Sequence, residues 1–223
     1  MSSNDTPMRE VARRAFATEF NDASHTFKES DDERAPAYQL LPTGEKANRV
    51  FFVGTLTEKE DIGDDNEYWR GRIVDPTGTF FVYAGQYQPE AASALRELEP
   101  PAYVAVVGKP RTYETDDGNV NVSVRPESIT VVDAATRDRW VVETAERTIE
   151  RVAAFDDEGS EAQDASGSRS SSGYNEYARM AADRYDLDPQ QYLDHAVEAL
   201  QSMEGAKSAD ADETAETESE PTP

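Results

Sequence analysis

The sequence predicts a mainly β protein with flanking helices, in which residues 49–133 form a five-stranded barrel of the OB-fold type. This stretch holds most of the β-branched and aromatic residues, and its apolar residues alternate with polar ones as in half-buried strands. It also divides into three strand-like segments, a short helical segment and two more strand-like segments, which is the order of elements in an OB-fold barrel. The hydrophobic fraction of 37% is enough for one modest core.

Residues that favour turns or breaks separate the predicted strands. An acidic loop at 58–67 follows the first strand, and an Asp-Pro-Thr-Gly turn at 75–78 joins the second to the third. A short helix at 89–98 ends at two prolines. Gly108 marks a bend in the fourth strand, and the hairpin turn at 116–118 leads into the fifth. The strands are therefore expected at 49–57, 68–74, 79–84, 103–113 and from 120 onward, the last with a break at Pro126.

The N-terminal region, 1–48, is expected to pack on the barrel as a helix followed by an extended segment. A helix at 7–20 is predicted because Thr6 is a suitable cap, Pro7 suits the first helical position, and apolar residues recur on one face. The polar stretch that follows favours two short extended pieces joined by a turn at 42–44.

A helix at 134–155, capped by Asp133, is expected to close the barrel domain, and it carries an apolar stripe. The stripe has two interpretations, which are packing beneath its own barrel and assembly with a partner protein. The rest of the chain is expected to form a flexible linker at 156–173, a pair of short helices at 174–204 and an acidic disordered tail at 205–223.

The formal net charge is −24, and arginine is favoured over lysine. Such a surface is typical of a protein adapted to molar salt, with an acidic tail on an ordinary mesophilic domain as the alternative. There is no cysteine, which excludes disulfides and thiolate metal sites. No apolar run approaches the roughly 18 residues of a membrane span, and the N-terminus lacks the apolar stretch of a signal peptide. We therefore expect a cytoplasmic protein with no membrane association.

Little in the sequence supports catalysis. The two histidines, His25 and His195, lie in peripheral segments, and no nucleophile, phosphate-loop or histidine-rich metal pattern occurs. The aspartates within 61–65 do not have the spacing of a calcium loop. We therefore expect no enzyme activity, no cofactor and no metal.

Parity along the strands places aromatic and basic side chains on the face opposite the core. If Phe80 and Ile73 point into the barrel, their neighbours along each strand point outward, onto the face where OB-folds bind single-stranded nucleic acid. Coverage of these aromatic residues by the helix at 134–155 or by the N-terminal segment is the alternative, and a register slip of one residue would exchange the two faces. The candidate nucleic-acid-binding residues are Tyr68, Arg70, Arg72, Phe81 and Tyr83, extended from the fourth and fifth strands by Lys109, Arg111 and Arg125.

High salt reconciles this surface with the acidic composition, which otherwise disfavours nucleic-acid binding. At 1 M salt the Debye length is about 3 Å, so long-range repulsion is nearly abolished, and attraction to phosphates weakens in the same way. Base stacking survives these conditions. A single-strand binder in molar salt should therefore rely on aromatic residues more than on a basic patch.

Several longer motifs carry a family resemblance. They read Arg-Ile-Val-Asp-Pro-Thr-Gly-Thr-Phe-Phe-Val-Tyr-Ala-Gly-Gln-Tyr-Gln-Pro at 72–89, Ser-Val-Arg-Pro-Glu-Ser-Ile at 123–129 and Thr-Arg-Asp-Arg-Trp-Val-Val at 136–142, with Arg-Glu-Val-Ala at 9–12 and Glu-Arg-Ala-Pro at 33–36. With these motifs, the chain resembles the haloarchaeal replication protein A-associated proteins over about residues 8–155.

The resemblance implies an OB-fold partner of replication protein A, the single-stranded DNA-binding protein of replication and repair. It offers no catalytic residues and no established DNA contacts to carry over. The sequence thus predicts an accessory protein that binds single-stranded DNA together with replication protein A. The alternative is an OB-fold adaptor that binds a partner chain and never contacts nucleic acid.

Overall fold

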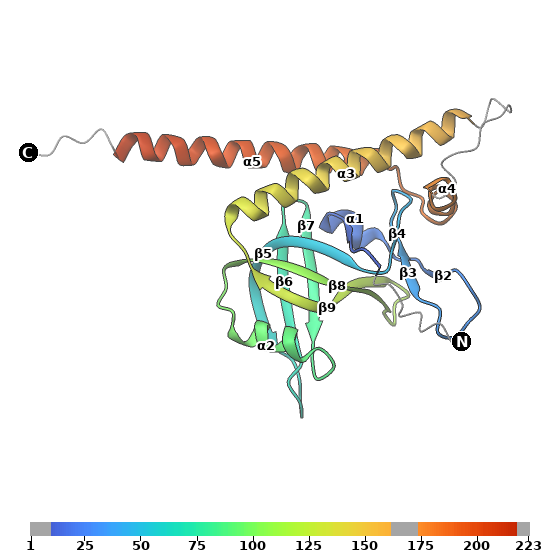
Figure 1. The fold of residues 1–223 in the computed structure, drawn as a ribbon, viewed down its shortest axis with the longest axis horizontal. Helices are drawn as coiled ribbons and strands as arrows, with labels where there is room; N and C mark the ends of the chain where they lie inside the picture. The colour runs from blue at the N-terminus through green and yellow to red at the C-terminus, as the bar shows by residue number, and fades with distance from the viewer. Residues whose placement is uncertain (1–9, 162–173, 218–223) are drawn as a thin grey trace, which may run out of the picture.

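The computed structural model describes residues 10–161 and 174–217. Its centre is a six-stranded sheet in the order β1-β5-β6-β7-β9-β8, which an additional β5–β8 pairing closes into a barrel (Figure 1). The helix α2, Pro89–Glu97, lies between the third and fourth barrel strands in sequence. This closed strand order with its single inserted helix is the OB-fold, as the sequence predicts. The five barrel strands are β5 Val50–Asp61, β6 Trp69–Asp75, β7 Gly78–Ala84, β8 Ala102–Glu114 and β9 Val120–Val131.

The barrel interior is filled by every second residue of its strands. Phe52 and Phe80 stack at its centre, with ring centroids 3.9 Å apart. Gly54 lets β5 and β6 approach closely, because a Cβ on it would lie 2.6 Å from the carbonyl oxygen of Val74. The inward-facing side chains that are essentially inaccessible to solvent include Leu56, Ile73, Val82, Val104, Val106 and Val124. The alternation seen in the sequence is therefore the alternation of core and surface.

Two strand limits differ from the prediction. The strand β5 runs on to Asp61, through the first part of the predicted acidic loop 58–67, because charged residues there pair with β6. The strand β9 passes through Pro126 without a break. Pro126 lies opposite Gly108, directly beside a bulge in which Glu127 is the extra residue of β9, and such a bulge tolerates a residue that has no N–H to donate.

The predicted helix at 7–20 is wrong for residues 10–16 and confirmed for 17–20. Strand β1, Arg13–Arg14, pairs in parallel with β5, and helix α1 covers only Ala17–Asp22. The barrel satisfies backbone donors of this segment, since the Arg13 N–H donates to the carbonyl oxygen of Arg49 at 2.8 Å and the Ala17 N–H to Asp75 at 2.8 Å. These contacts replace the hydrogen bonds that a longer helix would make. Residues 7–9 lie outside the described part.

The extended pieces predicted within 21–48 are present as a small antiparallel sheet. It consists of β2 Thr26–Lys28, β3 Ala37–Leu40 and β4 Lys46–Ala47. The turn between β3 and β4 has Gly44 at φ +83°, a left-handed conformation that favours glycine. A Cβ on Gly44 would lie 2.6 Å from the Cα of Ala178, so this turn is also where a C-terminal helix approaches the sheet.

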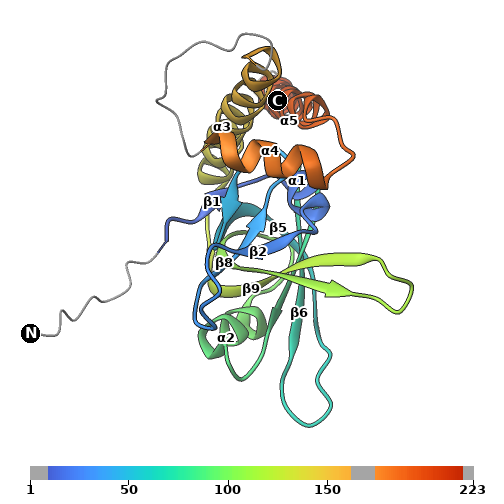
Figure 2. The same ribbon diagram turned by 90° about the vertical axis from the view of Figure 1, so that its right-hand side faces the viewer.

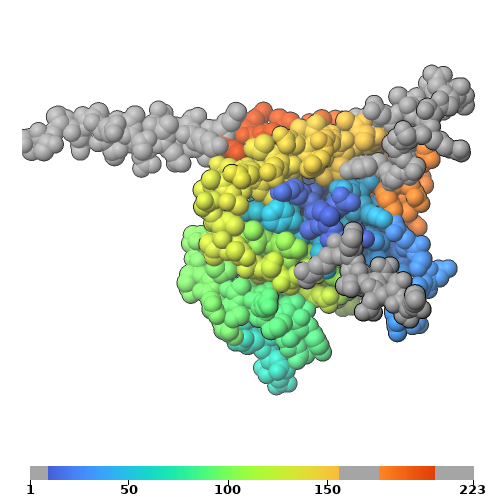
Figure 3. Space-filling view, viewed as in Figure 1, coloured from blue at the N-terminus to red at the C-terminus, as the bar shows by residue number. Residues whose placement is uncertain are grey.

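Three helices follow the barrel, namely α3 Ala134–Glu161, α4 Tyr174–Arg184 and α5 Gln190–Thr217. Helix α3 crosses one end of the barrel, and α5 packs against α3 (Figures 1 and 3). Most of the apolar stripe of α3 is covered, because Val141, Ala145 and Val152 are buried, whereas Ile149 is 39% exposed. Trp140 beside the stripe is also buried, and its indole donates to the carbonyl oxygen of Phe51 at 3.3 Å. Of the two interpretations of this stripe, packing on its own barrel is the one that the structure shows.

The predicted boundaries after the barrel need correction. Helix α3 extends through 156–161, where a linker was expected, and α5 extends through 205–217, where a disordered tail was expected. Glutamate occurs in both stretches and alanine recurs in 205–217, and both residues are strong helix formers. Residues 162–173 and 218–223 lie outside the described part. The two C-terminal helices also pack on the rest of the molecule, since Ala196, Ala199 and Met203 of α5 belong to the barrel's hydrophobic core cluster.

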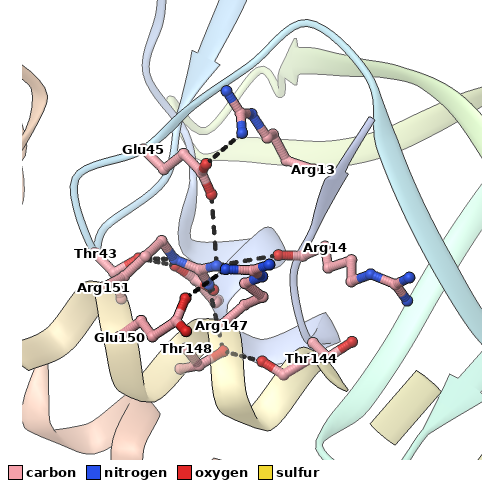
Figure 4. Close-up of polar contacts among 10 residues, drawn as sticks. Arg13, Arg14, Thr43, Glu45, Thr144, Arg147, Thr148, Glu150 and Arg151 are labelled. Carbon is pink, nitrogen blue, oxygen red and sulfur yellow. Dashed lines mark hydrogen bonds and ion pairs between the residues drawn. The ribbon is translucent and has the colours of Figure 1, made fainter. Parts of the chain in front are cut away.

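A buried ionic network joins α3 to the N-terminal region (Figure 4). Arg151 is 2% exposed, and its guanidinium donates to Glu19 at 2.5 Å and to Thr43 at 2.7 Å. It lies 3.5 Å from Glu45, which also pairs with Arg13 at 3.0 Å. The guanidinium thus ties together α3, α1 and the turn between β3 and β4.

Candidate nucleic-acid interface

The predicted outer surface of the second and third barrel strands is present in the structure. Across β6 and β7, Arg70 lies opposite Tyr83 and Arg72 opposite Phe81. Their neighbours along each strand, Gly71 with Ile73 and Phe80 with Val82, are buried in the barrel. The four side chains therefore share one face, which is the outer one. Tyr68, directly before β6, joins them, because its ring lies 6.0 Å from that of Tyr83 at an interplanar angle of 25°.

We call Tyr68, Phe81 and Tyr83 the stacking surface. Tyr68 is 43% and Phe81 36% exposed, whereas Tyr83 is half-buried. Helix α1 reaches β7 on the inner side, where the Phe20 ring contacts that of Phe80, and α3 packs near β5. The expected alternative, coverage of Phe81 and Tyr83 by the N-terminal segment or by α3, is not what the structure shows for α3 and for the N-terminal residues from 10 onward.

The two arginines beside the stacking surface are held by glutamates of β5. Arg70 donates to Glu60 at 2.6 Å, and Arg72 lies 3.7 Å from Glu58. Arg72 also donates to the hydroxyl of Thr57 at 3.2 Å. These pairs follow from the strand register, because Glu58 lies opposite Arg72 and Glu60 opposite Arg70. Each guanidinium thus already has an anionic partner.

The remaining predicted residues lie on the outer face of β8 and β9. Lys109 lies directly opposite Arg125, and Arg111 is two residues further along β8 on the same face. Burial lowers the pKa of Arg125 below its ordinary value, and the positive charge of Arg111 lowers it further. We call Lys109, Arg111 and Arg125 the cation triad. It adjoins the stacking surface, since β9 pairs with β7 at Val82 and Val124.

Two exposed tyrosines escaped the sequence analysis. Tyr113 is 65% exposed on the hairpin of β8 and β9, which projects from the barrel (Figure 2). It has the same parity as Lys109 and Arg111, so the alternation that singled them out was a sufficient signal to include it. Tyr87 lies in the turn between β7 and α2 and is 83% exposed. Nothing in a strand pattern predicts the exposure of a turn residue.

The histidines lie away from this interface, in packing contacts. The His25 ring stacks on Phe27 with centroids 6.2 Å apart, and burial, followed by the charge of Arg184, lowers the pKa of His25. The His195 ring lies 6.4 Å from that of Tyr192. Within the described ranges, the acidic and histidine side chains form no group of three that could hold a metal ion. The helices in those ranges are too short or too polar to cross a membrane.

Comparison of the sequence with protein-family models and with curated proteins finds no match. Among solved structures, the chain is similar to the second single-stranded DNA-binding protein of Mycobacterium smegmatis, at 19% identity and a TM-score of 0.33, over 38% of this chain and 86% of that one. It is also similar to the OBody NL8 bound to hen egg-white lysozyme, at 16% identity and a TM-score of 0.32, over 38% and 93% of the two chains. Asparaginyl-tRNA synthetase from Pyrococcus horikoshii has 19% identity and a TM-score of 0.31, over 39% of this chain and 20% of that one. The OB-fold assignment rests on the strand order and the closure of the barrel.

Proposed function

We propose that this protein binds single-stranded DNA through the stacking surface, as a non-catalytic accessory protein. The observation that carries the proposal is an exposed group of aromatic side chains on the outer face of β6 and β7, beside cations from β6, β8 and β9. Aromatic rings stack bases of any sequence, at roughly 1–3 kcal/mol per base, and neighbouring arginines add cation–π or phosphate contacts.

Replication protein A is the partner that we propose for this activity, in DNA replication and repair in the cytoplasm. The motifs at 72–89, 123–129 and 136–142 support this part of the proposal, through their resemblance to the haloarchaeal replication protein A-associated proteins. The first motif includes Phe81 and Tyr83, and the second includes Arg125. Part of the candidate interface therefore belongs to the stretches that carry the resemblance, whereas Tyr68, Arg70, Lys109 and Arg111 lie outside them.

A protein-only adaptor is the second candidate, and one observation favours it. The pairs Arg70–Glu60 and Arg72–Glu58 leave two cations of the interface already neutralised. An aromatic surface rimmed by satisfied ion pairs resembles a protein–protein interface, in which a polar rim surrounds aromatic anchors.

Oligonucleotide binding in about 1–2 M KCl, with and without replication protein A, distinguishes the two candidates. We expect the wild-type chain to bind oligo-dT, and Phe81→Ala with Tyr83→Ala to lose several-fold to hundreds-fold in affinity, at roughly 1–3 kcal/mol per lost stack. Ile149→Ala is the matched control, because Ile149 is an apolar side chain of similar exposure (39%) on α3. Capture of replication protein A without any binding of oligo-dT would leave the adaptor as the function.

A further inference from the structure

The basic side chains of the interface fall into two sets with different surroundings. Arg70 and Arg72 lie beside carboxylates, at 2.6 Å from Glu60 and 3.7 Å from Glu58. Lys109, Arg111 and Arg125 take part in none of the close ion pairs described above, and the carboxylate that acts on the cation triad is Glu127, whose charge raises the pKa of Arg125. The two sets therefore differ in how freely they can meet an anionic ligand.

The carboxylate nearest to the cation triad along β9 is already engaged. Glu127 lies two residues beyond Arg125 on the same face, and it accepts a hydrogen bond from the guanidinium of Arg49 at 2.7 Å. The remaining neighbours of Arg125 on that face are Lys109, directly across the ladder, and Arg111. Residues directly opposite in antiparallel strands have Cβ atoms about 4.5–5.5 Å apart, and like charges there destabilise the sheet.

This arrangement is unusual in a chain with a net charge of −24, in which acidic residues outnumber basic ones by 46 to 22. Three cations gathered on adjacent strands repel one another, and the charge of Glu127, which raises the pKa of Arg125, offsets only part of the effect of burial and of Arg111, since that pKa remains lowered. A bound polyanion would offset the repulsion, because a phosphate group accepts hydrogen bonds from a guanidinium at two oxygens. The cation triad is thus poised for an anionic ligand in a way that Arg70 and Arg72 are not.

The position of the cation triad connects it to the stacking surface. The parallel pairing of Val82 with Val124 places the next residues, Tyr83 and Arg125, side by side on the outer face. Neighbouring strands lie about 4.8 Å apart, so Arg125 is one strand spacing from Tyr83 and Lys109 is two. A nucleotide whose base stacks on Tyr83 therefore has its phosphate within reach of these two side chains.

We propose that Lys109, Arg111 and Arg125 form the phosphate-binding subsite of this surface, and that Arg70 and Arg72 do not bind phosphate. This inference rests on the proposed function. It divides the interface into a base-stacking part on β6 and β7 and a backbone-binding part on β8 and β9. It also sets the course of the strand across the barrel, from β6 over β7 and β9 to β8.

The salt dependence of affinity tests this division, because each phosphate contact on a single strand adds about −0.7 to the slope of log K against log salt. The slope is measured for the full chain with oligo-dT between about 0.5 and 2 M KCl. The triple variant Lys109→Gln, Arg111→Gln, Arg125→Gln should flatten the slope by about 2. The matched double variant Arg70→Gln, Arg72→Gln should leave the slope at the wild-type value. The reverse pattern, or a wild-type slope near zero, would overturn the subsite.

An abasic strand of the same length separates this inference from the proposed function, because it keeps the phosphates and lacks the bases. If the wild type binds the abasic strand more weakly than oligo-dT, and the triple variant binds the abasic strand more weakly still, the result supports both the phosphate subsite and base stacking. Equal binding of the two strands, abolished by the triple variant and unaffected by Phe81→Ala, supports the subsite and overturns stacking. Binding of neither strand overturns both, and unchanged affinity of the triple variant for both strands overturns the subsite alone.

Discussion

Replacing Arg151 with methionine removes one buried charge and keeps most of the side-chain volume. The guanidinium has five acceptors in the structure, which are the side chains of Glu19, Thr43, Glu45 and Thr148 and the backbone carbonyl of Arg14. Its loss leaves the carboxylate of Glu19, which is 1% exposed, without a cation and close to a second carboxylate.

Removing one partner of a buried ion pair costs about 3–5 kcal/mol, because the remaining charge stays desolvated. We expect a loss at the upper end of this range for Arg151→Met, since two carboxylates lose their shared cation. For a chain of this size, 1 kcal/mol corresponds to roughly 2–4 °C in melting temperature, so the midpoint should fall by about 10–20 °C. The loss should persist at about 2 M KCl, because buried pairs are screened much less than exposed ones.

Unfolding in urea measures this effect without changing the ionic strength. Arg147→Met is the matched control, one helical turn away on α3, because its ion pair with Glu150 at 2.6 Å is well exposed. Exposed pairs contribute about 0–1 kcal/mol, so this control should unfold almost like the wild type. Glu19→Gln combined with Arg151→Met should recover part of the loss by removing the stranded charge. If Arg151→Met and Arg147→Met had equal midpoints, the network would have no role in holding α3 to the N-terminal region.

Three further predictions address the core, the C-terminal helix and salt. Phe80→Ala should lower the free energy of unfolding in urea by about 3–5 kcal/mol, because it empties the barrel centre. Phe81→Ala should lower it by less than about 1 kcal/mol, and equal losses would contradict the assigned faces of β7. Ala199→Asp should lower the melting temperature strongly, because it places a carboxylate against the core. Val197→Asp, on the exposed side of α5, should leave the melting temperature nearly unchanged, and similar melting of both variants would argue against the docking of α5. The melting temperature of the wild type should rise from 0.1 M to about 2 M KCl, and it should continue to rise at concentrations where Debye screening is already saturated. A flat curve would contradict the interpretation of the acidic surface as an adaptation to salt.

The barrel and the faces of its strands could be predicted from the sequence because period-two alternation is a local signal. Phe80 and Phe81 show this most clearly, since adjacent identical residues have opposite environments, as their parity predicts. The cation triad was also found by parity.

The N-terminal helix could not be predicted correctly, because non-local contacts decide that segment. Residues 7–20 have helical periodicity and a capping residue, but the Arg13 N–H donates to the Arg49 carbonyl and so starts a strand. The network around Arg151 could have been predicted in part from the spacing of polar residues in α3. Thr144, Thr148 and Arg151 recur at helical spacing beside the apolar stripe of α3, and this spacing indicates a polar strip that faces the protein.

If the proposed function holds, the ion pairs of Arg70 and Arg72 bear on how so acidic a chain would bind single-stranded DNA in molar salt. The glutamates that pair with these arginines also fix them beside the stacking surface, so the polar side chains around a stacked base are already in position. At about 1 M salt the Debye length of roughly 3 Å confines repulsion to carboxylates in near contact with the ligand. Glu58 and Glu60 are near the stacking surface but are neutralised in pairs, whereas Glu127, the carboxylate that acts on Arg125, already accepts a hydrogen bond from Arg49. Under the proposed function, binding of a single strand in high salt therefore depends on contacts of short range. The outer face of β6, β7, β9 and β8 offers two kinds of group for such contacts, aromatic rings on β6 and β7 and the cation triad on β8 and β9.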